Sequence, residues 1–232
     1  MGAPRLEGKN DLRGKVEKYD IKKAHKELYA PSARSFSLVQ VPPLAYLAID
    51  GHGDPNTAPA YTEALEALYS VAYALKFHGK KELGQDCVVA PLEGLWWAQD
   101  MAAFTAREKA SWDWTMMIAL PGWAPADLVA PMVRQVAGKK DLPGLPRLCV
   151  AELDEGLCVQ IMHIGPYDAE GPVLERLHHE FMPEHGLHFN GRHHEIYLGD
   201  PRRAAPEKLK TILRQPVARG GEPPAGHGQA AG

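Results

Sequence analysis

The sequence predicts an α+β fold in which one β-β-α-β-β unit (strand, strand, helix, strand, strand) occurs twice. Two observations predict it. The order of strand-like and helix-like segments repeats along the chain, and the segments YLAIDGHGDP and VQIMHIGPYD occupy the same place in each copy. The two pseudo-repeats span about residues 35–121 and 147–217. We expect one antiparallel sheet or two abutting sheets, with both helices on one side and a central ligand cleft on the opposite face.

The first copy opens with two strands at residues 36–51, interrupted by a Pro-Pro pair that cannot continue a strand. A helix is predicted over residues 60–79, because apolar residues recur there at spacings of three and four. Two further strands follow at residues 87–97 and 111–123, and the intervening segment 98–110 is predicted as a short helix or loop. The apolar helix face consists of Tyr61, Leu65, Leu68, Ala72 and Leu75.

The second copy repeats this order. Two strands at residues 148–167 surround an Asp-Glu-Gly sequence that is typical of a hairpin turn. A helix is predicted over residues 168–186, followed by strands at 193–200 and 210–217. A helix at residues 124–138 links the two copies.

The segments outside the repeats have different compositions. Residues 1–34 are charged and are predicted to form a short helical or irregular N-terminal arm. Residues 35–217 are predicted to form the folded domain. Residues 218–232 are rich in Gly, Pro and Ala, lack an apolar pattern, and are predicted to be a disordered tail.

The composition excludes several classes of protein. The chain has 232 residues and a net charge of −3 with interspersed signs, which argues against a nucleic-acid partner. No apolar run reaches about 18 residues, so we expect no membrane span. The N-terminus lacks the apolar core of a secretory signal, which predicts a cytoplasmic protein. We expect it to be a monomer or a homodimer.

A carboxylate and a phenol share one face of the predicted strand at residues 193–200. Side chains alternate along a strand, so Ile196 and Leu198 point one way while Glu195 and Tyr197 point the other. If the apolar pair packs on the helices, Glu195 and Tyr197 face the cleft. An unpaired buried carboxylate is costly, which makes Glu195 a candidate functional residue.

The alternative for Glu195 is a structural ion pair with Arg192 or Arg214. The histidines at residues 178–194 raise the separate alternative of a metal site. No HExxH pattern and no Cys partner at ligand spacing accompany them, so we expect no metal. The motifs of dinucleotide, phosphate-loop and nucleophile-elbow sites are absent, and we expect no cofactor.

Tryptophan residues gather around the predicted cleft. Trp112 and Trp114 share a face of one strand, and Trp97 ends the strand before it. A cleft with several aromatic side chains and one carboxylate suits a flat aromatic or cationic small molecule. The alternative is that these tryptophans belong to the core.

Four segments carry a resemblance to a known family. They are KYDIKKAHKELY, IDGHGDPN, PLEGLWW and the C-terminal run that begins QIMHIGPYDAEGP. With them the chain resembles the GyrI-like small-molecule-binding family over residues 19–217. The resemblance implies a duplicated fold with a central cleft. In multidrug-sensing regulators of this family a buried glutamate on a late strand meets cationic aromatic drugs, and Glu195 occupies the matching strand.

The chain has no helix-turn-helix pattern and is more similar to the stand-alone branch of the family, which includes cyclopropanoid cyclopropyl hydrolases. The resemblance thus implies a hydrolase that opens the electrophilic cyclopropane of duocarmycin-type genotoxins by adding water, as detoxification or self-resistance. Two alternatives remain. One is a non-catalytic binder or sensor of aromatic or cationic drugs, and the other is an inhibitory partner of DNA gyrase, which rests on the family name alone.

The implied reaction gives the candidate residues roles. Glu195 would position or deprotonate water, and Tyr197 would donate to the oxygen that becomes a phenolate. His163 is a second candidate acid or base that also contacts the substrate. The side chains that would sandwich the flat substrate are Trp97, Trp112, Trp114 and Tyr167.

Overall fold

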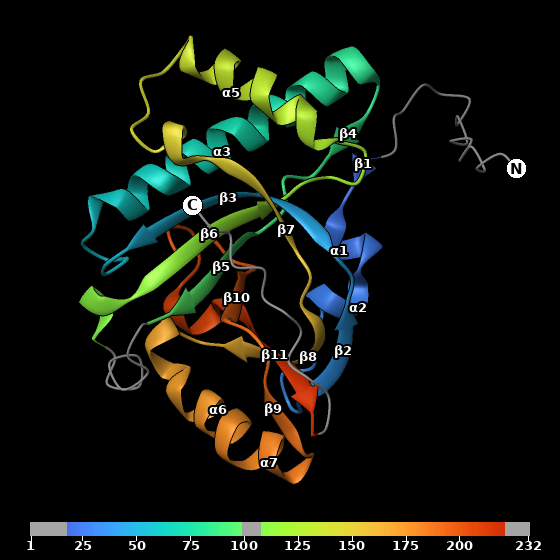
Figure 1. The fold of residues 1–232 in the computed structure, drawn as a ribbon, viewed down its shortest axis with the longest axis vertical. Coiled ribbons are helices and arrows are strands. Elements are labelled where there is room, and N and C mark those ends of the chain that lie inside the picture. Colours follow the sequence, from blue (N-terminus) through green and yellow to red (C-terminus); the bar gives the residue numbers. More distant parts are fainter. Residues whose placement is uncertain (1–17, 99–107, 221–232) are drawn as a thin grey trace, which may run out of the picture.

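A twisted sheet runs through the middle of the protein in the computed structural model, which describes residues 18–98 and 108–220 (Figure 1). Its strands are β2 (Ser37–Val41), β3 (Leu44–His52), β5 (Leu92–Trp97), β6 (Asp113–Ala119), β7 (Cys149–Leu153), β8 (Gly156–Ile164), β9 (Leu187–Phe189), β10 (His193–Tyr197) and β11 (Lys210–Arg219). The order along the sheet is β2-β8-β11-β10-β5-β6-β3-β7, with β9 paired to β11. Every pairing among them is antiparallel.

The predicted duplication is confirmed, and the two copies share a single sheet. β5 and β10, which occupy equivalent positions in the two copies, pair at the centre. The first strand of each copy pairs with the other copy, β2 with β8 and β7 with β3. This exchange interlocks the two copies, so that neither has a complete sheet alone.

Helices cover one face of the sheet, as predicted. The first copy contributes α3 (Pro59–His78), with α5 (Val129–Ala137) packed beside it. The second contributes α6 (Gly171–Arg176), a π-helical turn (Leu177–Phe181) and α7 (Met182–Glu184). Figure 1 shows these groups at opposite ends of the sheet. None of the helices in the described ranges has the length and apolarity that a membrane span requires.

Cross-strand pairing fixes which side chains share the helix-covered face. One row across the sheet runs through Ile49, Met116, Gly94, Glu195 and Leu213. Residues paired across neighbouring strands point to the same side. Trp114, two residues before Met116 and on the same side of β6, contacts Tyr61 of α3. Glu195 therefore faces the helix-covered side of the sheet.

The predicted position of the cleft, on the face opposite the helices, is wrong. That face is covered by the N-terminal arm, which forms β1 (Lys18–Tyr19), α1 (Ile21–Ala24) and α2 (Lys26–Tyr29). β1 pairs in parallel with β4 (Asp86–Cys87). The arm is part of the core, because Leu28 and Tyr29 are buried. Ile196 points to this back face rather than to the helices, since it alternates with Glu195.

The structure describes only part of the segments predicted outside the repeats. β11 continues to Arg219, two residues into the segment 218–232 that we expected to be a tail. The rest of that tail from residue 221, the first 17 residues and most of the segment 98–110 lie outside the described residues.

Buried charges tie the arm to the back of the sheet. The Tyr29 hydroxyl donates a hydrogen bond to Glu93 Oε1 at 2.8 Å. Arg214 donates from Nη2 to the backbone carbonyl of Leu28 at 2.9 Å and from Nη1 to Glu155 Oε2 at 3.1 Å. These contacts join four distant parts of the sequence, at residues 28–29, 93, 155 and 214, in a region without solvent access.

His194 lies at the centre of this cluster. Its Nδ1 is 2.9 Å from Glu155 Oε1 and its Nε2 is 3.1 Å from Glu93 Oε2. Burial alone lowers the pKa of the imidazole, but the two carboxylates outweigh it and raise the pKa of His194 to about 9. Burial alone raises the pKa of Glu155, but His194 and Arg214 outweigh it and lower that pKa to about 2.

The cluster predicts how stability depends on pH. The folded pKa of His194 lies above its ordinary value of 6.5, so its contribution is complete below about pH 6.5 and is lost as pH rises through about 9. The folded pKa of Glu155 lies below 4.5, so its contribution is lost as pH falls through about 2. We expect His194→Gln to cost about 3–5 kcal/mol and to remove the decline between pH 6.5 and 9.

Urea denaturation at a series of pH values, followed by far-UV circular dichroism, measures this. His52→Gln is the matched control, because the His52 side chain is 63% exposed and lies outside the cluster. It should keep the alkaline decline of the unmodified protein. A His194→Gln variant with the same alkaline decline would contradict the assignment.

Candidate functional site

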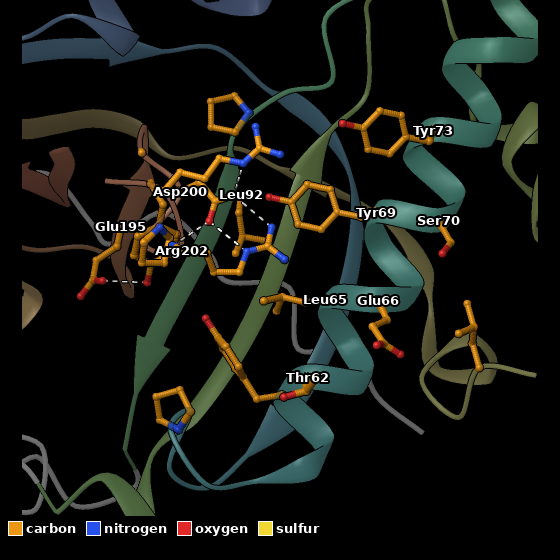
Figure 2. Close-up of a pocket in the computed structure, with 18 of the residues that line it drawn as sticks. Thr62, Leu65, Glu66, Tyr69, Ser70, Tyr73, Leu92, Glu195, Asp200 and Arg202 are labelled. Atoms are coloured by element: carbon orange, nitrogen blue, oxygen red, sulfur yellow. Dashed lines mark hydrogen bonds and ion pairs between the residues drawn. The ribbon is translucent and has the colours of Figure 1, made fainter. Parts of the chain in front are cut away.

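A cavity of about 1600 Å³ lies between α3 and the centre of the sheet, on the helix-covered face. Its lining comes from α3, β5, β10, α5 and the loop of residues 199–203. Figure 2 shows Tyr69 and Tyr73 pointing from α3 toward Leu92 and Arg202 on the opposite wall. The cavity therefore opens between the two copies, and one helix forms a full side of it.

Glu195 lies on the sheet wall of this cavity. Its side chain is 15% exposed, and its Oε2 accepts a hydrogen bond of 2.7 Å from the Tyr197 hydroxyl. The Trp96 indole in turn donates from Nε1 to the Tyr197 oxygen at 2.9 Å. The other carboxylate oxygen, Oε1, lies 3.5 Å from Nε2 of the buried His193. The carboxylate is thus held by one oxygen, with the second oxygen beside an imidazole.

Gly94 makes room for the hydrogen bond from the Trp96 indole to Tyr197. It pairs directly with Glu195 across β5 and β10, and a Cβ atom there would come within 2.8 Å of Trp96 Nε1 and 3.2 Å of Met116 Sδ. The Trp96 indole therefore lies over the bare glycine. This position brings its N–H to the Tyr197 oxygen.

Aromatic rings enclose the carboxylate. The centroid of the Tyr61 ring lies 6.3 Å from that of Trp96, and the Trp96 and Trp112 centroids are 5.8 Å apart. On the other side, Tyr167 meets Tyr197 edge to face with centroids at 5.6 Å. Such a wall favours flat aromatic ligands, and a carboxylate inside it also favours cations.

The phenols of this wall stay protonated at neutral pH. Burial raises the pKa of Tyr61 and of Tyr197 well above the usual range, and Glu195 raises both further. Burial, followed by Glu170 and Glu195, raises the pKa of Tyr167 to about 12. Each hydroxyl can therefore donate a hydrogen bond, and that of Tyr197 already donates to Glu195.

Four of the predicted site residues line the cavity together, and three do not. Those in the lining are Trp112, Tyr167, Glu195 and Tyr197. Trp114 has no exposed surface, because its ring packs against Gly51 and the edge of Tyr61. The Trp97 ring lies under the Arg192 guanidinium at 3.6 Å. His163 is buried, with Nε2 3.2 Å from the Pro166 carbonyl oxygen.

The two arginines that were the alternative ion-pair partners of Glu195 have other partners in the structure. Arg214 pairs with Glu155, and Arg192 stacks on Trp97. Among the described residues, no group of three or more His, Cys, Asp or Glu side chains is arranged to hold a metal ion. His193 and His194 point to opposite faces of β10, one toward Glu195 and the other into the buried charge cluster.

Sequence reasoning missed Trp96 and the cavity-lining face of α3. Trp96 follows Gly94 by two residues and shares its face, but only the pairing of β5 with β10 shows that this face carries Glu195. The sequence predicts Tyr61 and Leu65 on the apolar face of this helix, because they are four residues apart. The structure places them at the edge of the core, where they also line the cavity.

The family follows from the sequence comparison. The family described as the GyrI-like small molecule binding domain matches residues 34–218. The chain belongs to this GyrI-like family. No curated protein matches the chain.

Solved structures of similar proteins agree with the family. An uncharacterised conserved protein from Listeria innocua is 37% identical, covers 87% of this chain and all of its own, and has a TM-score of 0.80. A protein described as a hydrolase from Listeria innocua is 35% identical over 87% of this chain and 100% of its own, with a TM-score of 0.76. The EcmrR C-terminal domain, at 11% identity, 80% and 98% coverage and a TM-score of 0.50, shares the fold.

The close approach at Gly94 gives a direct test of the site. Gly94→Ala should displace the Trp96 indole, break its hydrogen bond to Tyr197 and cost about 1–3 kcal/mol through overpacking. Near-UV circular dichroism reports the tryptophan environment, and urea denaturation gives the free energy of unfolding.

Gly122→Ala is the control, because an added Cβ there meets nothing within 4 Å. It should leave both signals unchanged. If Gly94→Ala also leaves both unchanged, Trp96 does not depend on the bare glycine.

Proposed function

We propose that this GyrI-like protein is a hydrolase that opens an electrophilic cyclopropane, conjugated to a dienone as in duocarmycin-type genotoxins, by adding water. One observation carries the proposal: a largely buried carboxylate, held through one oxygen by Tyr197, lies inside an aromatic-walled cavity. Two similar proteins described as hydrolases, 35% and 36% identical to this chain, support a hydrolytic reaction. The biological role would be detoxification or self-resistance.

The proposed step conserves atoms and electrons. Glu195 takes a proton from a water molecule while the water oxygen bonds to the cyclopropane CH₂. The strained carbon–carbon bond breaks, and its electron pair moves through the dienone to the carbonyl oxygen, which becomes a phenolate. The phenolate then takes up a proton and Glu195 releases one, so the net change is the gain of one water.

Holding one oxygen of Glu195 leaves the other to orient the water. Oε2 is engaged by Tyr197, whereas Oε1 lies toward His193 and can also accept a hydrogen bond from water. Tyr197 thereby acts on Glu195 rather than on the substrate carbonyl, which differs from the role first inferred for it. The hydroxyls of Tyr61 and Tyr167, kept protonated by their raised pKa values, are the candidate donors to the developing oxyanion.

A non-catalytic binder of aromatic or cationic drugs is the second candidate. The observation that favours it is the same enclosure of one carboxylate by aromatic rings, which can hold an aromatic cation without any reaction. A binder neutralises its ligand one for one, while an enzyme consumes an excess.

Turnover of a cyclopropane-bearing, duocarmycin-type compound in large molar excess tests the proposal, with product followed by mass spectrometry. The expected result is repeated gain of one water per molecule. Glu195→Gln keeps the shape and removes the base, so we expect turnover to fall about 10²- to 10⁴-fold while ligand binding persists.

Glu82→Gln is the matched control, since it makes the same change at an exposed carboxylate outside the cavity. It should turn over like the unmodified protein. Tight binding without product would replace the hydrolase with the binder, and full activity in Glu195→Gln would remove Glu195 from the reaction.

A further inference from the structure

A buried histidine lies behind the candidate carboxylate. His193 is 6% exposed, and neither of its ring nitrogens has a hydrogen-bond partner among the described residues. Buried polar groups in native proteins are almost always hydrogen-bonded, and each exception calls for an explanation. The reaction proposed above assigns this imidazole no role, although it lies beside the carboxylate that carries the reaction.

The position of His193 suits a donor to Glu195. The two side chains point to the same side of β10, and Nε2 lies 3.5 Å from Oε1, just beyond the ~2.7–3.2 Å of an ordinary hydrogen bond. Catalytic hydrogen bonds are often long in a site without substrate and shorten when the substrate binds. Oε1 has two lone pairs, so it can accept one hydrogen bond from His193 and one from the attacking water. An N–H on Nε2 would thus fix the direction of Oε1 and leave room for the water.

The strands on either side of β10 do not supply His193 with a donor. Trp96, which pairs directly with His193, donates its indole N–H to Tyr197. Gln215, on the same side of β11, donates its side-chain amide to two backbone carbonyl oxygens. These side-chain N–H groups are already engaged, so a partner for the second nitrogen of His193 has to come from the helix side.

His178 approaches His193 from that side, in the π-helical turn between α6 and α7. Its Nε2 is also buried and has no hydrogen-bond partner among the residues that the structure describes. Burial, followed by the nearby His193 and His179, lowers the pKa of His178 to about 4, so this ring is neutral at pH 7. The edge of the Phe189 ring packs against it, with the ring centroids 4.9 Å apart. Single π-helical turns within helices occur frequently at functional sites.

One water molecule between the two rings would satisfy both of them. If the ring proton of His193 is on Nε2, its Nδ1 is an acceptor, and Nε2 of a neutral His178 with its proton on Nδ1 is an acceptor too. A water molecule can donate one hydrogen bond to each. A hydrogen bond to one ring nitrogen determines which nitrogen carries the proton. The Nε2–H of His193 then points at Glu195.

We propose that His193 is a positioning residue for Glu195: its Nε2–H holds Oε1, and a water-mediated link from its Nδ1 to His178 Nε2 fixes the ring. Its effect on the reaction rests on the proposed function. The α6–α7 segment then supports the carboxylate from the second copy, while the α3 side of the cavity supplies the aromatic Tyr61.

Long-range ¹H–¹⁵N correlation spectra of the histidine rings test this arrangement without any substrate. At pH 7 the expected tautomers are Nε2–H for His193 and Nδ1–H for His178. Glu195→Gln should shift the His193 Nε2 resonance, whereas His188→Leu, a change at an exposed histidine, should not. A His193 ring with its proton on Nδ1 overturns the inference, whether or not the protein turns over the cyclopropane.

Turnover of the duocarmycin-type compound tests the effect on the reaction. His193→Leu removes the donor, so we expect kcat to fall at least about tenfold through misplacement of Oε1, with KM within about twofold of the unmodified protein. His193→Gln, whose amide can donate, should recover most of this loss. In a Glu195→Gln background, His193→Leu should change the residual turnover by less than about twofold, because the two side chains act as a unit. His188→Leu is the matched control and should keep full turnover.

The outcomes separate positioning from a merely structural role. A loss that is equally large in the Glu195→Gln background, or a His193→Gln variant as slow as His193→Leu, overturns the inference. If His193→Leu does not fold, His178→Leu at a partly buried position replaces it, with a smaller fall in kcat and the same dependence on Glu195. An unmodified protein without turnover overturns the proposed function, and the spectra then decide whether His193 holds Glu195.

Discussion

The antiparallel pairing of β5 with β10 at the centre of the sheet determines what each face of the molecule can do. It places Glu195 opposite Gly94, where a missing side chain lets the Trp96 indole reach Tyr197 and so fix the carboxylate. Because side chains alternate along β10, His194 points the other way and meets Glu93 and Glu155. The same short strand therefore carries the candidate chemistry on one face and a buried charge cluster on the other.

Because the two faces of the sheet have these separate roles, the cavity can be open without weakening the sheet. The back face is closed by the N-terminal arm, whose Tyr29 hydroxyl and Leu28 carbonyl bond to buried charges. On the front, α3 and the α6–α7 segment cover the two ends and leave the centre accessible. A polar group left without partners inside such a sheet would be costly, so the paired charges of the back face support the strand that presents Glu195.

The duplicated order of elements could be predicted from the sequence, because turns and apolar periodicity are local signals. That Glu195 and Tyr197 share one face of their strand could also be predicted, since alternation depends on the strand alone. The further step, that this face holds the cleft, assumed that Ile196 packs on the helices, whereas Ile196 points to the arm-covered face. Which side of the sheet holds the cleft could not be predicted, because it depends on where the arm packs, and nothing in residues 18–34 specifies their partner. The sequence also does not distinguish Trp96 from Trp97 as the ring that lines the cavity, because only the register between two strands about 100 residues apart separates them.

A crystal structure of the protein with the ring-opened product of a duocarmycin-type compound tests the central claim most directly. The account predicts the product between α3 and β10, with the hydroxyl derived from water within hydrogen-bonding distance of Glu195 Oε1 and the flat unit against Trp96 and Trp112. Product bound on the arm-covered face, or bound in the cavity with its new hydroxyl directed away from Glu195, would contradict it.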